Sequence, residues 1–251
     1  MGSELPPAVL PPHPTLSPYY DAPGQKRNFL KKIFDDTAGD YDRMERLASF
    51  GTGPWYRREA LKRAGLSAGM RVLDVAVGTG LVAREEIAIV GSPSLVTGLD
   101  PSIGMMKLAV EQLGISAIRG VGESLPLADE QFDFLSMGYA LRHLSDLRAA
   151  FAEFHRVLKP GGRVCILEIT RPTNLVQRTF LRAYMKGVLP LLSRVTSGRS
   201  DTQKLWAYYW DTIDQCLPAQ QVLDALTAAG FAEVKRYSEM GMFSEYTGRK
   251  A

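Results

Sequence analysis

The residues best suited to bind a cofactor lie in two neighbouring strand-like segments. An apolar run from Val72 to Val75 carries Asp74 and opens into a turn that ends Gly78-Thr79-Gly80. A second apolar run, Val96 to Leu99, ends in Asp100. Glycine in such a turn lets the backbone approach a bound molecule closely, because no Cβ intervenes. An acid after the second strand typically accepts hydrogen bonds from the ribose hydroxyls of a nucleotide-like cofactor.

Each of these residues also has a purely structural interpretation. Gly78 and Gly80 are equally compatible with a tight turn that contacts no ligand. Asp74 could cap a turn or a helix, and Asp100 could cap the helix that begins near Ser102. The positions of the glycine turn and of Asp100 relative to each other favour the cofactor interpretation.

Composition and charge are those of an ordinary globular enzyme. The chain has 251 residues, 45% hydrophobic and 23% charged, with a net charge of +3. Its basic residues are dispersed, which gives no case for nucleic acid. With Cys165 and Cys216 as the only cysteines, we expect no disulfide framework and a reducing compartment. No apolar stretch is long enough to span a bilayer, no signal-type segment opens the chain, and Pro6 argues against myristoylation. We therefore expect a cytoplasmic protein.

Strands and helices alternate along most of the chain. The pattern is helical over 28–63, and the segment Lys159-Pro-Gly-Gly162 is expected to stop a later helix. This alternation predicts an α/β fold with an open, mostly parallel sheet, helices on both faces and ligands at the carboxyl ends of the strands. Strands are expected at 71–75, 94–99, 117–121, 132–137, 163–168, 232–238 and 243–248. Helices are expected between them at 81–89, 102–112, 146–157 and 218–229, with a helical insertion at about 173–209.

The beginning of the chain has a different character. Residues 1–25 contain seven prolines and little periodicity, which predicts a disordered tail. Residues 26–251 are expected to form a single domain.

Three ordered motifs resemble one enzyme family. They are Tyr41-Asp42-Arg43-Met44 with Ser49-Phe50-Gly51, then Gly138-Tyr-Ala-Leu-Arg-His143, then Arg156-Val-Leu-Lys-Pro-Gly-Gly162 with Leu167-Glu168. Residues 34–172 resemble the ubiquinone and menaquinone biosynthesis C-methyltransferases of the UbiE type, and the C-terminal third does so more loosely. The resemblance implies a Rossmann-like class I methyltransferase fold of seven strands, with a helical lid, that uses S-adenosylmethionine.

The resemblance also implies which residues bind the cofactor. Gly78 and Gly80 would pack against its amino acid part, Asp100 would hold the ribose diol, and Gly138 and Tyr139 would lie near the sulfonium. Met105 could flank the adenine, although core packing is the commoner use of methionine. The implied cofactor residues are Tyr41, Asp74, Ala76, Gly78, Gly80, Asp100, Pro101, Met105, Val121, Gly122, Gly138 and Tyr139.

Five positions depart from the family pattern. Val77 replaces a glycine and is expected to narrow the turn. Val121 replaces an Asp or Asn that faces the adenine, and valine cannot accept that hydrogen bond. Glu45 stands for an Asn, Gly53 for a His, and His143 for an Asn. Several of these positions lie on the substrate side in the family, so they bear on the reaction and leave the expected fold unchanged.

Ring methylation needs a phenolate and a correctly placed methyl donor. Arg142 is the candidate for stabilising that oxyanion, with a structural ion pair as the alternative. His143 is the candidate base, because its reference pKa of roughly 6.5 suits proton transfer near neutrality. Glu45 could hold a substrate amine or a metal, or face solvent. His155 is interpreted as structural, and His13, in the tail, as irrelevant.

The insertion is apolar and carries basic residues around its apolar face. Such a segment can cap a pocket for a prenyl tail and rest on an anionic membrane surface. A buried lid helix and half of a homodimer interface are equally compatible. The apolar residues are Phe180, Leu181, Tyr184, Met185, Val188, Leu189, Leu191 and Leu192, and the basic ones are Arg178, Arg182, Lys186 and Arg194. Trp206, Tyr208, Tyr209 and Trp210 could line the same pocket or form core.

These observations leave three hypotheses. The first is methyl transfer from S-adenosylmethionine to a ring carbon of a polyprenyl quinol or related phenol. The second is an enzyme of rhodoquinone biosynthesis, which exchanges a methoxy group of ubiquinone for an amino group. That reaction would use S-adenosylmethionine and a divalent metal, Mn or Mg, with Glu45 as a metal ligand. The third, a non-catalytic scaffold of the quinone pathway, is disfavoured by the glycine turn and by Asp100.

Overall fold

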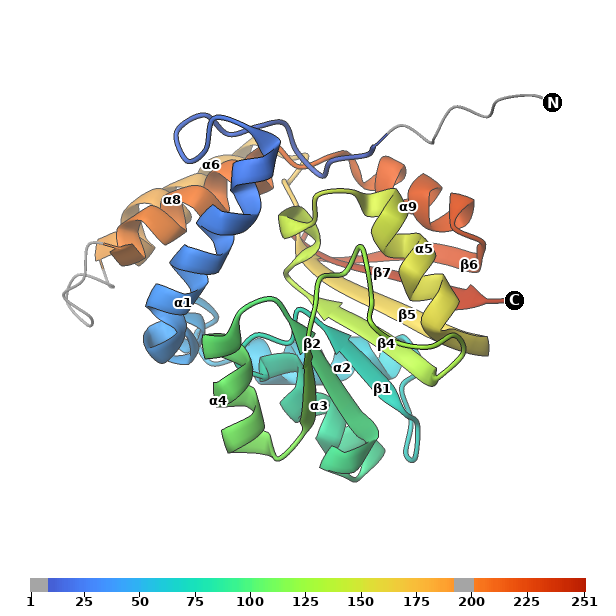
Figure 1. Cartoon of the computed structure of the whole chain (residues 1–251). Coiled ribbons are helices and arrows are strands. Elements are labelled where there is room, and N and C mark those ends of the chain that lie inside the picture. Colours follow the sequence, from blue (N-terminus) through green and yellow to red (C-terminus); the bar gives the residue numbers. More distant parts are fainter. Residues whose placement is uncertain (1–8, 192–200) are drawn as a thin grey trace.

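A computed structural model describes residues 9–191 and 201–251, and its framework is one seven-stranded sheet (Figure 1). The strand order is β3-β2-β1-β4-β5-β7-β6. The first five strands run parallel, whereas β7 is antiparallel to both β5 and β6. The expected α/β class and the mostly parallel sheet are confirmed. The strands are β1 (Val72–Val75), β2 (Val96–Asp100), β3 (Ser116–Arg119), β4 (Phe132–Gly138), β5 (Leu158–Ile169), β6 (Phe231–Glu239) and β7 (Phe243–Lys250).

Helices cover both faces of the sheet, and a separate group of helices lies beyond its edge (Figure 1). One face carries α5 (Leu147–Val157) and α9 (Ala219–Ala228). The other face carries α2 (Gly53–Arg63), α3 (Leu81–Val90) and α4 (Ile103–Leu113). The separate group consists of α1 (Pro23–Ala48), α6 (Leu175–Ala183), the π-helical turn η3 (Tyr184–Val188) and α8 (Asp201–Asp214). We call this group the helical cover.

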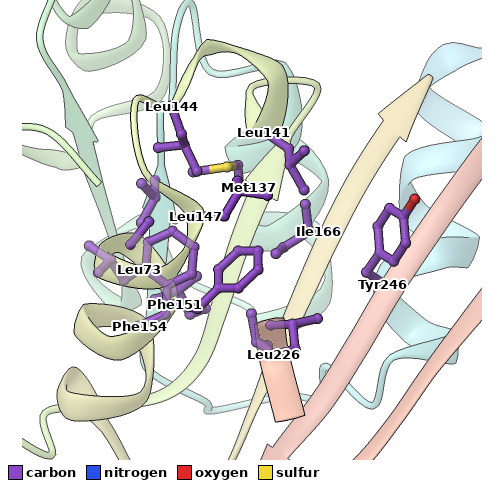
Figure 2. Packing of buried hydrophobic residues seen from close by; sticks show 14 of the residues in the cluster. Leu73, Met137, Leu141, Leu144, Leu147, Phe151, Phe154, Ile166, Leu226 and Tyr246 are labelled. Atoms are coloured by element: carbon purple, nitrogen blue, oxygen red, sulfur yellow. The ribbon is translucent and has the colours of Figure 1, made fainter. Parts of the chain in front are cut away.

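The central strands are apolar on both sides because helices bury both faces of the sheet. All four residues of β1 are buried. Toward α5 and α9, Leu73 and Met137 pack with Phe151, Phe154 and Leu226 (Figure 2). The pattern of short buried strands followed by amphipathic helices is therefore explained by packing against this one sheet.

The helix before Lys159-Pro-Gly-Gly162 ends as the sequence predicted, but the segment itself belongs to the next strand. Helix α5 ends at Val157, and β5 begins directly at Leu158, which pairs with Phe132. The register then shifts before Phe134 pairs with Arg163. The glycines thus accommodate an irregularity inside a strand, where a bulge needs a flexible backbone.

The described part of the N-terminal segment, residues 9–22, is packed, which corrects the prediction of a disordered tail. Leu16 and Tyr20 are buried against the helical cover. The carbonyl of Leu10 accepts from the N–H of Leu147, at the start of α5, at 2.9 Å. Proline-rich composition pointed to disorder, but fixed contacts with distant elements hold this segment in place.

The two described parts of the insertion after β5 are helical as expected: α6 with η3, and α8, which ends at Asp214. Two of the residues that the sequence analysis assigned to it, Leu192 and Arg194, lie outside the described residues. The aromatic residues of α8 are core: Trp206, Tyr208, Tyr209 and Trp210 are all buried in the helical cover.

Candidate active site

A cleft opens at the carboxyl ends of β1, β2 and β4, beneath α1, and holds about 1240 Å³ of space including its open mouth. Parallel sheets of this kind bind ligands at this edge. The sheet wall of the cleft consists of Val75, Ala76, Val77, Gly78, Thr79, Leu81, Val82, Leu99, Asp100, Pro101, Ser102, Met105, Val121, Gly122, Glu123, Met137, Gly138, Tyr139, Ala140, His143, Leu144 and Ser145. The wall contributed by α1 and α2 consists of Arg27, Leu30, Lys31, Phe34, Tyr41, Glu45 and Arg57.

The two glycines of the β1 turn have different roles. Gly78 has φ +56°, and a Cβ built on it would meet no atom within 4 Å, so the backbone there faces open cleft. Gly80 does not line the cleft. A Cβ at Gly80 would come within 2.5 Å of Leu113 and 3.3 Å of Ala109. The lack of a side chain at Gly80 therefore allows α3 to pack closely against α4.

Asp100 lies at the cleft, where it organises the two neighbouring turns. Its Oδ2 accepts from the N–H of Gly78 at 3.0 Å, and its Oδ1 accepts from the N–H of Ser102 at 2.8 Å. Burial raises the pKa of Asp100 to about 6, although these two bonds oppose the shift. Each carboxylate oxygen has lone pairs left for a ligand.

Asp74 lies under the turn and does not reach the cleft. Its Oδ1 accepts from Ser136 Oγ at 3.2 Å. Burial, and the neighbouring carboxylate of Glu86, raise the pKa of Asp74 well above its usual range. The side chains of successive strand residues alternate between faces, so Asp74 points into the layer between sheet and helix. This corrects its assignment as a cofactor-contacting residue.

Two non-glycine residues that line the cleft adopt the left-handed backbone conformation. Ala76 and Tyr139 both have φ +59°. Ala76 directly follows Val75, the last residue of β1, and Tyr139 directly follows Gly138, the last residue of the adjacent strand β4. Such backbone conformations cost free energy and concentrate at functional sites. They bend both strand exits so that backbone groups face the cleft.

Two side chains tie α1 to the sheet. Thr79 Oγ1, in the glycine turn, donates to Asp42 Oδ1 at 2.5 Å. Ser102 Oγ donates to Asp35 Oδ1 and also caps α4, accepting from the N–H of Met105 at 3.2 Å. The helix therefore covers the cleft in a fixed position, with Tyr41 on its inner face.

The valine substitutions at the cleft have unequal consequences. The side chain of Val77 is buried against Gly98 of β2. A Cβ added to Gly98 would come within 2.8 Å of the Val77 side chain. Gly98 thus makes room for the side chain of Val77, which also lines the cleft. Val121 lines the cleft with Gly122, beside the buried Met105.

Arg142 does not line the cleft, which corrects the prediction that it contacts a substrate oxyanion. It lies in the 3-10 turn η2 (Leu141–His143), where successive side chains point in different directions. Its buried guanidinium forms an ion pair with Glu168 of β5 and lies 4.8 Å from the ring centre of Tyr209. The structural ion pair, the alternative interpretation of Arg142, is the observed one.

His143, the next residue, does line the cleft. Its Nδ1 lies 3.3 Å from Tyr208 Oη, and its ring stacks on that of Tyr208 and meets the edge of Phe34. Burial, with the nearby charges of Arg142 and Lys26, lowers the pKa of His143 well below its usual range. His143 is therefore neutral at neutral pH.

Glu45 also lines the cleft, in an ion pair that the sequence did not reveal. Arg57 Nη1 of α2 donates to Glu45 Oε1 at 2.7 Å. Burial raises the pKa of Glu45, against the opposing charge of Arg57. Gly53 provides the space, because a Cβ there would collide with Glu45 Oε1. Glu45 and Gly53, which both depart from the family pattern, are thus parts of one structural feature.

Lys26, like Arg57, is a residue that the sequence analysis did not single out. Its Nζ is buried and donates to the carbonyls of Leu144 at 2.7 Å and Arg142 at 3.2 Å. Burial lowers the pKa of Lys26 to about 8. His13, expected to be irrelevant, is buried close by, and burial lowers its pKa to about 4. No local pattern marks either residue, since both act across the fold.

A family model now identifies the chain: the ubiE/COQ5 methyltransferase family matches residues 22–250. The chain belongs to this family. A UbiE ubiquinone/menaquinone biosynthesis C-methyltransferase from Syntrophotalea carbinolica is 33% identical over 232 residues, covering 90% of this chain and 94% of that protein. A demethylmenaquinone methyltransferase from Desulfitobacterium hafniense is 31% identical over 234 residues, covering 90% and 91%. The expected S-adenosylmethionine-dependent methyltransferase is confirmed.

The fold of this methyltransferase has close counterparts among solved structures. One from Thermotoga maritima, described as a S-adenosylmethionine-dependent methyltransferase and possible histamine N-methyltransferase, superposes with a TM-score of 0.62. The match covers 88% of this chain and 99% of that one at 22% identity, so it supports the fold alone.

The cleft of the methyltransferase fits S-adenosylmethionine. Asp100 supplies two carboxylate oxygens where a ribose diol needs acceptors, and the open backbone at Gly78 admits a close approach. The rhodoquinone hypothesis assigned Glu45 to a divalent metal. Glu45 is paired with Arg57, and no group of three His, Cys, Asp or Glu side chains among residues 9–191 and 201–251 could hold a metal ion.

Proposed function

We propose that this methyltransferase moves the methyl group of S-adenosylmethionine to a ring carbon of a polyprenyl quinol or related phenol. One observation carries the proposal: a single cleft joins the wall around Gly78 and Asp100 to an aromatic wall on α1, with His143 between them. A cofactor and an aromatic substrate would meet in that cleft. The named relatives act in ubiquinone or menaquinone biosynthesis.

The cofactor would lie along the sheet wall. Asp100 would accept hydrogen bonds from the two ribose hydroxyls, and Pro101 would begin the adenine side of the site. Met105, Val121 and Gly122 would form the rest of that adenine side. Gly122 has little room for a side chain, since a Cβ there would come within 3.0 Å of Leu144.

The other half of the cofactor would follow the turns after β1 and β4. Its methionyl part would lie over Ala76 and Gly78. Its sulfonium would face the backbone of Gly138 and Tyr139, next to Tyr41 of the cover. This arrangement directs the methyl group toward the aromatic wall.

The substrate ring would lie against α1. Leu30, Phe34 and Tyr41 present apolar and aromatic surface to the cleft. An apolar wall suits a hydrophobic ring and tail, and it excludes water from the reacting atoms. In-line placement against an already activated sulfonium is a large part of catalysis in methyl transfer.

His143 would bind the ring oxygen. If Tyr208 O–H donates to Nδ1, the neutral ring carries its proton on Nε2 and can donate to the oxygen as it becomes a phenolate. The lowered pKa of His143 suits this donor role, because the ring does not hold a second proton at neutral pH. Arg142 would act through η2, by positioning His143.

The reaction balances without a further reactant. The S–CH₃ bond of the sulfonium breaks as a C–CH₃ bond forms at the ring carbon next to the phenolate. The hydroxyl proton passes to solvent when the phenolate forms, and the proton on the methylated carbon then moves, through water, to the ring oxygen and restores the aromatic quinol. S-adenosylhomocysteine and the methylated quinol leave, with one proton released in total.

Product analysis tests this proposal. Purified protein is incubated with S-adenosylmethionine and a short-chain quinol that lacks the ring methyl group, and the quinone is weighed by mass spectrometry. We expect the gain of one methyl group, with equal yield in a metal chelator. Exchange of methoxy for amino on a methoxylated quinone, abolished by chelator and restored by Mn or Mg, would overturn methyl transfer.

The helical cover also supports peripheral contact with the inner face of the cytoplasmic membrane. Leu175, Val176 and Phe180 project from α6, each more than 60% exposed, beside the exposed Arg182. Phe180 stacks on Tyr184, which also contacts the exposed Phe50. Apolar surface flanked by positive charge suits an anionic bilayer. Every helix within the described residues is too short or too polar to cross a membrane.

Sedimentation with vesicles tests this contact. We expect binding to vesicles that contain phosphatidylglycerol, reduced at least tenfold in Phe180→Ser and unchanged in Val110→Ser, an exposed residue of α4. Equal binding by both variants would show that the α6 face around Phe180 does not contact the membrane. Light scattering distinguishes the remaining outcome, a second copy of the chain packed on the same face as a homodimer.

A further inference from the structure

We infer that Arg57 and Glu45 form a receptor for the amino acid end of S-adenosylmethionine, with Arg57 binding its carboxylate and Glu45 its ammonium group. The inference rests on the proposed function, and it gives these two residues a role in binding the methyl donor. It also explains why an ion pair lies in the wall of an otherwise apolar part of the cleft.

The location of the pair agrees with the direction of the cofactor. Asp42 accepts from Thr79 in the glycine turn, and Glu45 lies one helical turn further along α1, on the same face. The charges of Arg57 and Glu45 both act on the pKa of Tyr139, which also lines the cleft, so the pair lies close to the exit of β4. Asp35, two helical turns before Asp42 on α1, accepts from Ser102 at the start of α4, so the pair lies past Thr79 in the direction away from Ser102. With the adenosine at Asp100, the amino acid part extends toward the pair.

The hydrogen bonding of Arg57 leaves capacity for a ligand. Its side chain is only 2% exposed, yet its Nε has no partner among the described residues. A buried guanidinium with an unused donor costs free energy, and proteins rarely leave one without a function. A carboxylate is the ligand that matches this planar group best, because both of its oxygens can accept at once.

Glu45 supplies the complementary charge. Its side chain is 23% exposed, so the carboxylate is accessible from the cleft while one oxygen holds Arg57. An α-amino acid carries an ammonium and a carboxylate on one carbon. Adjacent acceptor and donor groups therefore bind such a zwitterion without leaving a net charge buried.

Gly53 makes this receptor sterically feasible. A Cβ at that position would collide with Glu45 Oε1 and approach Arg57 Nη1 to 2.8 Å. Any larger residue must displace one member of the pair. The glycine at 53 and the glutamate at 45 therefore belong to the same binding device.

Calorimetry with three nucleosides tests the inference. S-adenosylhomocysteine carries the whole amino acid part, decarboxylated S-adenosylmethionine keeps only the amine, and 5′-methylthioadenosine has neither group. Arg57→Gln should weaken S-adenosylhomocysteine about 30-fold, the scale of a lost charged bond. It should change the affinity for the other two nucleosides less than twofold. Glu45→Gln should weaken S-adenosylhomocysteine and the decarboxylated compound about fivefold, and leave 5′-methylthioadenosine unchanged.

Arg58→Gln is the matched control. Arg58 is on the same helix and forms an ion pair with Glu85, outside the cleft. We expect it to bind all three nucleosides as the unmodified protein does. Unchanged binding of 5′-methylthioadenosine by Arg57→Gln also demonstrates an intact adenosine site.

Three results would overturn the inference. One is equal loss of all three nucleosides in Arg57→Gln, which would make Arg57 purely structural. Another is unchanged affinity for S-adenosylhomocysteine in that variant. If Arg57→Gln does not fold, the unmodified protein decides: equal affinity for S-adenosylmethionine and its decarboxylated form would overturn the inference. Absence of binding by every nucleoside would overturn the proposed function as well, whereas normal binding without a methylated product would overturn the function alone.

Discussion

The two walls of the cleft are built in opposite ways. The sheet wall consists of strand exits and the turns that follow them, so neighbours in the chain are neighbours at the site. Gly78 and Asp100, for example, lie at the ends of adjacent strands and share a hydrogen bond of 3.0 Å. The cover consists of segments that are distant in sequence: Lys26 reaches the loop at Leu144, and Tyr19 donates to Asp211 at 2.7 Å.

This difference assigns separate tasks to the two walls. The sheet wall uses backbone groups, glycines and the acid Asp100 at the end of β2, which suit a cofactor of fixed shape. The cover presents Leu30, Phe34 and Tyr41, which suit a hydrophobic substrate, together with charged residues of α1. Changes in the sheet wall should therefore alter cofactor affinity, and changes in the cover, apart from the ion-paired Glu45, should alter turnover. His143 follows strand β4 of the sheet wall, but its ring packs against Phe34 and Tyr208 of the cover. A change at His143 therefore tests most directly whether the two walls have separate tasks.

The largest effect is expected for His143→Ala. Loss of the proposed donor to the phenolate should lower kcat by a factor of about 100 to 1000, the scale for one oxyanion-stabilising group. The affinity for S-adenosylmethionine should stay within threefold, because the group acts in the transition state. Steady-state kinetics and calorimetry measure the two quantities.

His143→Asn is the control, since asparagine can also donate and is the usual family residue. We expect it to keep most of the turnover. An equal loss in both variants would indicate that the imidazole itself transfers a proton.

Asp100→Ala should have the next largest effect, on the sheet wall. We expect S-adenosylmethionine to bind more weakly by about 1–3 kcal/mol, the scale for hydrogen bonds to a charged group. The variant also removes the acceptor for the N–H of Gly78, which should increase disorder in the turn. Calorimetric titration measures the affinity, and unchanged affinity would remove Asp100 from the cofactor site.

The same residue predicts a pH dependence. Its pKa is raised to about 6, so the carboxylate takes up a proton as pH falls through 6 and loses acceptor capacity. Cofactor affinity should therefore decrease below pH 6, by about tenfold per pH unit at the limit of one proton. In Asp100→Asn this segment of the profile should be flat. An unchanged profile would assign the titration to another group.

Lys26→Met tests the cover, with an intermediate effect. The variant removes the donor to the carbonyls of Arg142 and Leu144, and so releases the loop that carries His143. We expect a loss of about 1–3 kcal/mol in the free energy of unfolding, for acceptors left buried without a partner. Turnover should fall more than cofactor affinity. Lys32→Met, an exposed change on the same helix, should leave both quantities unchanged.

The smallest effect is expected for Val121→Asp. An acid at this position could accept from the adenine amino group, so S-adenosylmethionine should bind up to about tenfold more tightly or equally well. Turnover could still fall if the altered cofactor position is less productive. A large loss of affinity in a folded variant would show that the adenine does not lie beside Val121.

Much of the sheet wall was predictable because it depends on local rules. The turn at Gly78, the acid at Asp100 and the helix begun by Ser102 follow from strand length, glycine and capping preferences within short segments. The predictions failed where a side chain's direction decides its role. Asp74 and Arg142 were correctly placed along the chain, but they point into the interior, toward Ser136 and Glu168.

The sequence by itself determined the alternation of elements, the sheet they form, and the edge at which a cofactor binds, because hydrophobic period and glycine position act over a few residues. Only the tertiary structure decided the rest. It brought Arg57 of α2 against Glu45 of α1, and it folded the proline-rich segment around His13 into the cover. Such pairings depend on where whole helices dock, and no pattern within one helix records the partner that it will meet.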